Sequence, residues 1–157
     1  MVILGIDPGT TRVGYGLIRK EAGGLQHLAS GLFPIPPGDL SSRLFSLHAE
    51  AKKMLVSARP DRAGIEQLYF FKNQKTAIEV AEARGVLLFT LAEAGVPIVE
   101  ITPLQVKLGV AGSGNASKKA VASMVFRFLG ITPRSLPDDV TDALAVAIAV
   151  SGNVLSR

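Results

Sequence analysis

Short apolar runs separated by turn residues fill the first third of the chain and predict strands. Residues 2–6 are apolar and stop at an Asp-Pro-Gly turn, residues 13–18 follow as a hairpin partner, and residues 25–35 begin after Gly-Gly. Turn residues between such runs are a strong local signal of antiparallel strands. The pattern therefore predicts a meander of three antiparallel strands.

From residue 40 the apolar positions recur every three or four residues, the periodicity of a helix with one buried face. Residues 40–58 follow this pattern, with Asp39 or Ser41 as the capping residue and Pro60 as the stop. The remaining elements predicted in the same way are helices over 73–94, 103–110, 118–129 and 137–150 and strands over 63–66 and 96–101.

The order of these elements predicts an α/β fold in a single domain, residues 1–157. Three meander strands followed by alternating helices and strands suit one mixed five-stranded sheet, three strands antiparallel and two parallel, flanked by helices on both faces. Gly85 interrupts the helix predicted over 73–94, where glycine costs about 1 kcal/mol relative to alanine. We expect a close contact between this helix and the sheet at Gly85.

Composition excludes several classes of protein. The chain has 157 residues, 48% of them hydrophobic and 19% charged, a balance that excludes disorder. It has no cysteine and two histidines, which excludes a disulfide framework and a thiol nucleophile and leaves oxygen ligands for any metal. Neither a leader nor an apolar stretch of about 20 residues is present, so we expect a cytoplasmic protein with no membrane contact.

Positive charge is concentrated in one block of the chain. The net charge is +4, and no acidic residue occurs between Glu100 and Asp138. Within this block, residues 112–119 form a Gly-rich stretch that ends in Lys118 and Lys119 at a helix start, where backbone N–H groups and ammonium charges bind phosphate. Solvated lysines on a loop are the alternative interpretation. The acid-free block favours nucleic acid as the partner.

Isolated carboxylates stand where predicted strands end. Asp7 follows the run 2–6, and Glu66 ends the run 63–66. In open sheets, ligand-binding groups gather at the carboxyl ends of strands. An aspartate in a turn also commonly caps its own backbone, whereas a carboxylate that ends a buried run needs a partner. We therefore expect the two carboxylates to lie close together.

Three more acids open the last predicted helix. Asp139 and Asp142 are three residues apart and Asp138 and Asp142 are four apart, so spacing allows either pair on one face. For Asp138 we favour a stabilising interaction with the helix dipole. Converging with Asp7 and Glu66, these acids would repel one another, and one or two Mg²⁺ ions would relieve the repulsion. Two such ions activate water and stabilise the leaving oxygen in phosphodiester hydrolysis.

Three adjacent aromatic residues follow Glu66, in a chain with nine in total. We assign Phe71 to the core and expect the others to stack on bases or wedge between them. His27 and His48 are assigned no role.

An ordered set of motifs resembles the RuvC family of Holliday junction resolvases over nearly the whole chain. The motifs are Gly5-Ile6-Asp7-Pro8-Gly9, Ala63-Gly64-Ile65-Glu66-Gln67, Ala83-Arg84-Gly85, Gln105-Val106-Lys107, the Gly-rich stretch to Lys118, and Asp139-Val140-Thr141-Asp142-Ala143-Leu144-Ala145. The resemblance implies an RNase H-like fold, a homodimer, and cleavage of four-way DNA junctions that depends on Mg²⁺, with Mn²⁺ as a substitute. It also implies association with the branch-migration machinery.

The same resemblance implies roles for individual residues. It places the catalytic, metal-binding acids at Asp7, Glu66, Asp139 and Asp142, and so favours Asp139 over Asp138. It places DNA contacts at Tyr69, Lys107 and Lys118, to which the Gly-rich stretch adds Lys119. Two positions depart from the family pattern: Tyr69 replaces the usual phenylalanine, and Ala120 replaces a common glutamine.

Three other functions remain open at this point. An RNase H-like nuclease that acts on RNA would share the fold. An actin-like ATPase has a phosphate loop similar to residues 7–11, although it needs two such domains. A catalytically silent DNA-binding module would gain nothing from carboxylates that face phosphate.

The helix predicted over 73–94 is our candidate for a dimer interface, because a four-way junction is two-fold symmetric and needs two active sites. Its apolar positions exceed one stripe. Complete burial of this helix within its own subunit is the alternative.

Overall fold

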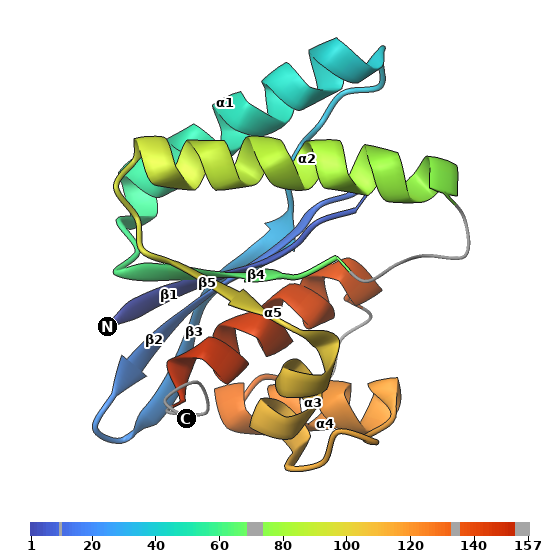
Figure 1. Ribbon diagram of the computed structural model, residues 1–157. Coiled ribbons are helices and arrows are strands. Elements are labelled where there is room, and N and C mark those ends of the chain that lie inside the picture. The colour runs from blue at the N-terminus through green and yellow to red at the C-terminus, as the bar shows by residue number, and fades with distance from the viewer. Residues whose placement is uncertain (10, 69–73, 133–135, 153–157) are drawn as a thin grey trace.

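The structure is a computed structural model that describes residues 1–9, 11–68, 74–132 and 136–152 (Figure 1). Every element expected from the sequence occurs within three residues of its predicted limits. The strands are β1 (Val2–Asp7), β2 (Gly14–Glu21), β3 (Gly24–Leu32), β4 (Arg62–Glu66) and β5 (Ile98–Ile101). The helices are α1 (Leu40–Ala58), α2 (Gln74–Glu93), α3 (Pro103–Ala111), α4 (Lys118–Leu129) and α5 (Asp138–Ser151).

The strands form one mixed sheet in the order β3-β2-β1-β4-β5. The pairs β1–β2 and β2–β3 are antiparallel, and the pairs β1–β4 and β4–β5 are parallel. Helices α1 and α2 cover one face, α5 crosses the other, and α3 and α4 lie beyond α5 (Figure 1). The predicted mixed sheet, with a three-stranded meander and two parallel strands, is confirmed.

Helix α5 packs unusually close to the sheet. Its residues 143–150 are all buried, and four of them are alanine. Glycines in the strands allow this approach: a Cβ added at Gly5 would lie 2.1 Å from the backbone oxygen of Ala143, and one at Gly64 would lie 2.9 Å from the side chain of Val146. The contact at Gly5 places the first turn of α5 at the carboxyl end of β1.

The other face of the sheet holds a second apolar core. Leu47 of α1 and Leu87 of α2 pack with Leu4 and Ile65 of the central strands, and all four side chains are at most 1% exposed. Burial of a leucine-sized side chain contributes roughly 1.5–3 kcal/mol. This core holds α1 and α2 to the sheet independently of α5.

The expected contact between Gly85 and the sheet is wrong. Gly85 is exposed, and a Cβ added there would meet no atom within 4 Å. The sheet-facing side of α2 is defined by Val80, Ala83, Leu87 and Leu91, and Gly85 lies about half a turn away from it. The glycine leaves a bare strip of backbone on the outer surface of α2.

Side-chain caps fix where α3 and α4 begin. Thr102 accepts a hydrogen bond from the Gln105 backbone N–H, and the Gln105 side chain accepts one from Thr102 in return. Ser117 caps α4 through the Ala120 N–H. The α3 cap follows β5 directly, so the first turn of α3 lies at the same edge of the sheet as the end of β4. Within the described residues, no helix is long and apolar enough to cross a membrane.

Candidate active site

Two carboxylates lie at the same edge of the sheet because their strands are parallel neighbours. Asp7 is the last residue of β1 and Glu66 the last residue of β4. The two strands pair in register up to Ile6 and Ile65. Asp7 and Glu66 therefore leave the central strands side by side, as the sequence predicted.

Helix α5 brings two further acids to this edge. A Cβ at Gly14, the partner of Asp7 on β2, would lie 2.0 Å from the backbone oxygen of Asp139, so the start of α5 touches the end of β1. Asp142 follows one turn later. The acids assembled here from β1, β4 and α5 are Asp7, Glu66, Asp139 and Asp142.

The four acids interact electrostatically. The pKa of Asp7 is raised from 3.8 to about 8, first by burial and then by the negative charges of Asp142, Glu66 and Asp139. Burial, followed by the charge of Asp142, also raises the pKa of Glu66. Without a bound metal ion, Asp7 therefore holds a proton at neutral pH that a free aspartic acid would have lost.

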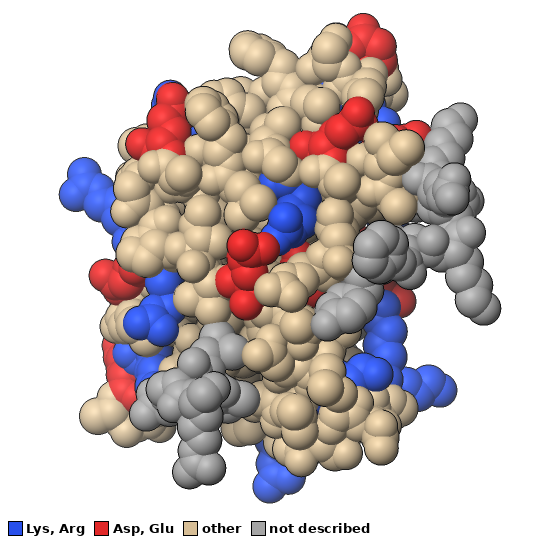
Figure 2. Space-filling model, in the orientation of Figure 1, with Lys and Arg blue, Asp and Glu red and all other residues tan. Residues whose placement is uncertain are grey.

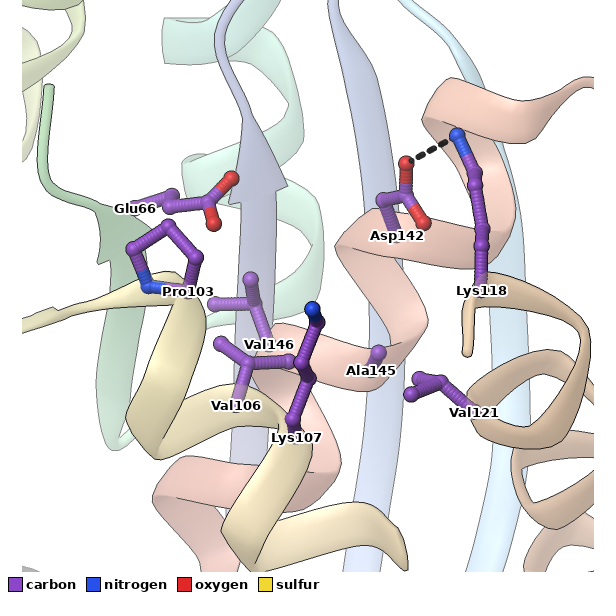
Figure 3. A pocket seen from close by; sticks show the side chains of 9 residues that line it. All are labelled: Glu66, Pro103, Val106, Lys107, Lys118, Val121, Asp142, Ala145 and Val146. Carbon is purple, nitrogen blue, oxygen red and sulfur yellow. Dashed lines mark ion pairs between the residues drawn. The ribbon is translucent and has the colours of Figure 1, made fainter. Parts of the chain in front are cut away.

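A cleft of about 300 Å³ opens beside these acids (Figure 3). Glu66 and Asp142 face it from opposite sides, and the ammonium group of Lys107 points into the space between them. The floor is apolar and consists of side chains from α3, α4 and α5: Val106, Val121, Ala145 and Val146. The cleft thus brings carboxylates and ammonium groups together above an apolar floor.

Lys118 lies closer to the acids than the sequence suggested. Its Nζ is 2.9 Å from Asp142 Oδ2 and 3.1 Å from Asp138 Oδ2. The pKa of Lys118 is raised because these two carboxylates together outweigh the opposing effect of its partial burial. In turn, Lys118 lowers the pKa of Asp142, although burial dominates and leaves it raised overall. Lys118 therefore neutralises part of the acidic cluster when no other cation is bound.

Arg12 is a site residue that the sequence analysis missed. Its guanidinium NH2 is 2.9 Å from Asp139 Oδ2 and forms an ion pair with it, while this buried oxygen has no hydrogen bond. Arg12 belongs to no motif and stands in the loop between β1 and β2, so only the folded chain shows its proximity to Asp139. Arg12 therefore places a positive charge beside one of the four acids.

The donors at this site suit a hard cation such as Mg²⁺, which prefers carboxylate oxygens. The raised pKa of Asp7 and the incompletely satisfied Asp139 oxygen both favour a positive charge here. Within the described part of the chain, however, no group of three or more Asp, Glu or His side chains is close enough to hold a metal ion. A bound Mg²⁺ characteristically keeps several waters and takes substrate phosphates as ligands, so it needs no complete protein cage.

The remaining predicted residues differ in their placement. Lys107 lines the cleft, whereas Lys119 is exposed and is not part of its lining. Tyr69 and Phe71 lie outside the described residues. His27 and His48 form hydrogen bonds to Ser30 and Thr90, and neither lines the cleft. Acidic and basic side chains are interspersed over the face in Figure 2, with basic groups projecting near α4.

Comparisons with known proteins agree with this arrangement. Residues 3–150 match the family described as crossover junction endodeoxyribonuclease RuvC. RuvC proteins of Syntrophomonas wolfei and Moorella thermoacetica are each 46% identical over 94% of this chain and over 87% and 89% of their own lengths. The structure of T. thermophilus RuvC in complex with a Holliday junction substrate matches with a TM-score of 0.89 and 35% identity, over 96% of this chain and 93% of that one.

The sheet order and the helices on its faces define an RNase H-like fold, as expected. Yeast mitochondrial Ydc2, a Holliday junction resolvase only 14% identical, shares the fold with a TM-score of 0.69. The chain belongs to the RuvC family of crossover junction endodeoxyribonucleases. It is a Holliday junction resolvase, a hydrolase that cuts DNA where duplexes cross, and the resemblance seen in the sequence is confirmed.

Proposed function

We propose that this chain cleaves four-way DNA junctions with Mg²⁺ held by Asp7, Glu66, Asp139 and Asp142. The observation that carries the proposal is the convergence of these acids at one buried edge of the sheet, where burial and then the neighbouring negative charges raise the pKa of Asp7 to about 8. A bound Mg²⁺ would activate water and stabilise the leaving oxygen of the phosphodiester. Mn²⁺ has the same preference for oxygen ligands and would substitute for Mg²⁺.

The cations around the cleft have a separate role in this proposal. Lys107 points between the carboxylates, so it offers positive charge to a phosphate that enters the cleft. Lys118 is exposed and paired with Asp142, and it would exchange this carboxylate for a DNA phosphate when a divalent cation neutralises the acids. Lys119, one residue further along α4, would contact the backbone outside the cleft.

Removal of charge without a change in shape tests the assignment of the acids. Glu66→Gln and Asp142→Asn should abolish nicking of labelled junctions while gel-shift assays still show binding, because the substitutions remove metal ligands and reduce repulsion of phosphate. Glu50→Gln is the matched control, since Glu50 pairs with Lys53 on α1, away from the cleft. Nicking by either site variant at the rate of this control would refute the assignment.

The outer face of α2 is the proposed homodimer interface. Ile78 and Phe89 are 61% and 62% exposed, and Ala81, Gly85 and Ala92 are exposed on the same stripe. The spacing of three and four residues aligns them along one side of the helix. The bare backbone at Gly85 lets a second helix approach closely. A two-fold dimer through α2 would supply two active sites to a two-fold symmetric junction.

Light scattering should give about twice the chain mass at micromolar concentration for such a C₂ dimer. Phe89→Glu should yield a monomer and separate the two nicks in time. Phe128→Glu, an equivalent change at a 43% exposed position on α4, should leave the dimer intact. A Phe89→Glu protein that stays dimeric would place the interface elsewhere.

Three further parts of the proposal rest on family membership. Tyr69 would stack on bases at the centre of the junction, where an aromatic face suits any base. The dimer would work beside the branch-migration machinery at the same junction. Its place would be the cytoplasm, with the DNA on which it acts.

A further inference from the structure

Arg84 on α2 reaches back to the strand that ends in Glu66. Its Nε donates a hydrogen bond of 3.1 Å to the backbone carbonyl of Glu66, and its NH2 group pairs with the Glu100 carboxylate on β5. The Arg84 side chain is only 15% exposed, so the guanidinium is held inside the structure. One side chain therefore joins α2, β4 and β5 at the point where β4 ends.

The backbone of Glu66 is paired on one side only. The pairing of β4 with β1 ends at Ile65, one residue earlier, whereas Glu66 still pairs with Ile101 of β5, and the next N–H, that of Gln67, donates to the Ile101 carbonyl oxygen over 2.8 Å. A carbonyl at a strand end requires a donor in place of the missing strand partner. Arg84 provides a charged donor, which forms a stronger hydrogen bond than a neutral one.

We propose that Arg84 is a positioning residue for the active site. By fixing the backbone of Glu66, it directs the carboxylate into the cleft opposite Asp142. Loss of this contact would let Glu66 turn away, so metal binding and hydrolysis would weaken more than folding. The inference rests on the proposed role of Glu66 as a metal ligand. Loss of such outer contacts to a ligand typically costs about 10–100-fold in metal affinity or activity.

A purely electrostatic role of Arg84 predicts the opposite result. Arg84 is a cation near an acidic cluster, so removal of its charge alone would strengthen binding of a divalent cation. Arg84→Lys keeps the charge but replaces the planar guanidinium fork with a single ammonium group. Positioning therefore predicts weaker binding in both Arg84→Gln and Arg84→Lys, whereas charge alone predicts tighter binding in the first and no change in the second.

Calorimetric titration of the DNA-free protein with Mg²⁺ tests the proposal directly, together with single-turnover cleavage of a junction and thermal unfolding. Both Arg84 variants should bind Mg²⁺ about 10–100-fold more weakly than wild type and cleave more slowly at fixed Mg²⁺. Val80→Ala is the structural control: Val80 is buried on the same helix, so its truncation should lower the melting temperature without changing Mg²⁺ affinity.

Wild-type Mg²⁺ affinity and cleavage in the Arg84 variants would overturn the inference, as would tighter binding by Arg84→Gln. If neither variant folds, Glu100→Gln is tested instead. Glu100 is exposed and pairs with Arg84, so this substitution frees one end of the Arg84 guanidinium and should also weaken Mg²⁺ binding. A wild-type protein that binds no Mg²⁺ and cleaves without it would instead refute the proposed metal dependence.

Discussion

Replacement of Asp7 by asparagine should stabilise the metal-free protein at alkaline pH. The pKa of Asp7 is raised from 3.8 to about 8 by burial and by the neighbouring acids. The folded state therefore binds this proton more tightly than the unfolded state does. The resulting stabilisation is fully present below about pH 4 and is lost as the pH rises toward 8.

The shift sets the size of the effect. Each pKa unit corresponds to roughly 1.4 kcal/mol, so the raised pKa of Asp7 lowers the free energy of unfolding of the wild type by about 3 kcal/mol at pH 6 and about 5 kcal/mol at pH 8, relative to strongly acidic pH. Asparagine avoids this cost, but an unpaired buried amide costs about 1–3 kcal/mol. The net gain in the variant is then about 2–4 kcal/mol at pH 8, or about 5–15 °C in melting temperature. At pH 5 the gain should nearly vanish.

Thermal unfolding of both proteins at pH 5 and pH 8, with chelator and at one protein concentration, measures this difference. Glu93→Gln, which changes an exposed acid on α2, should show no dependence on pH relative to wild type. Added Mg²⁺ should stabilise wild type more than Asp7→Asn, because binding to the folded state alone raises stability. An Asp7→Asn protein no more stable than wild type at pH 8 would refute the reasoning.

Other substitutions give distinct expected outcomes. Lys118→Ala should move the rising limb of the pH–rate profile to higher pH, because Lys118 lowers the pKa of Asp142. An unchanged profile would mean that Lys118 does not influence the ionisation of Asp142 during cleavage. Lys107→Ala should weaken junction binding and reduce the slope of log affinity against log salt by about one, and an unchanged slope would mean that Lys107 meets no phosphate. Tyr69→Ala should impair cleavage more than Tyr69→Phe, since base stacking is worth about 1–3 kcal/mol; equal rates would exclude stacking.

Local patterns in the sequence were sufficient to predict the fold. Apolar runs, turn residues and helical periodicity predicted the five strands and five helices that the described residues form, with α4 at the same limits as predicted. The position of Asp7 and Glu66 also followed from the sequence, because parallel central strands end at one edge. These features depend on spacing along the chain, which the sequence shows directly.

Features that depend on packing between distant elements could not be predicted in this way. The side-chain contacts of Lys118 with Asp142 and of Arg84 with Glu66 require particular placements of α4 and α2. Gly85 was misassigned for the same reason, because a glycine that permits a close contact and one that leaves a helix bare look alike in sequence. The contact residues Arg12 and Asp139 are more than a hundred positions apart.

The central claim is that the carboxylates hold Mg²⁺ to cut four-way junctions. Its most direct test is incubation of the wild-type protein with labelled four-way junctions, linear DNA duplex and an RNA duplex, with and without Mg²⁺. We expect paired nicks in the junction alone, only when Mg²⁺ is present, and none by Glu66→Gln in the same series. Cleavage of the junction in chelator, or equal cleavage of the linear or RNA duplex, would contradict the account.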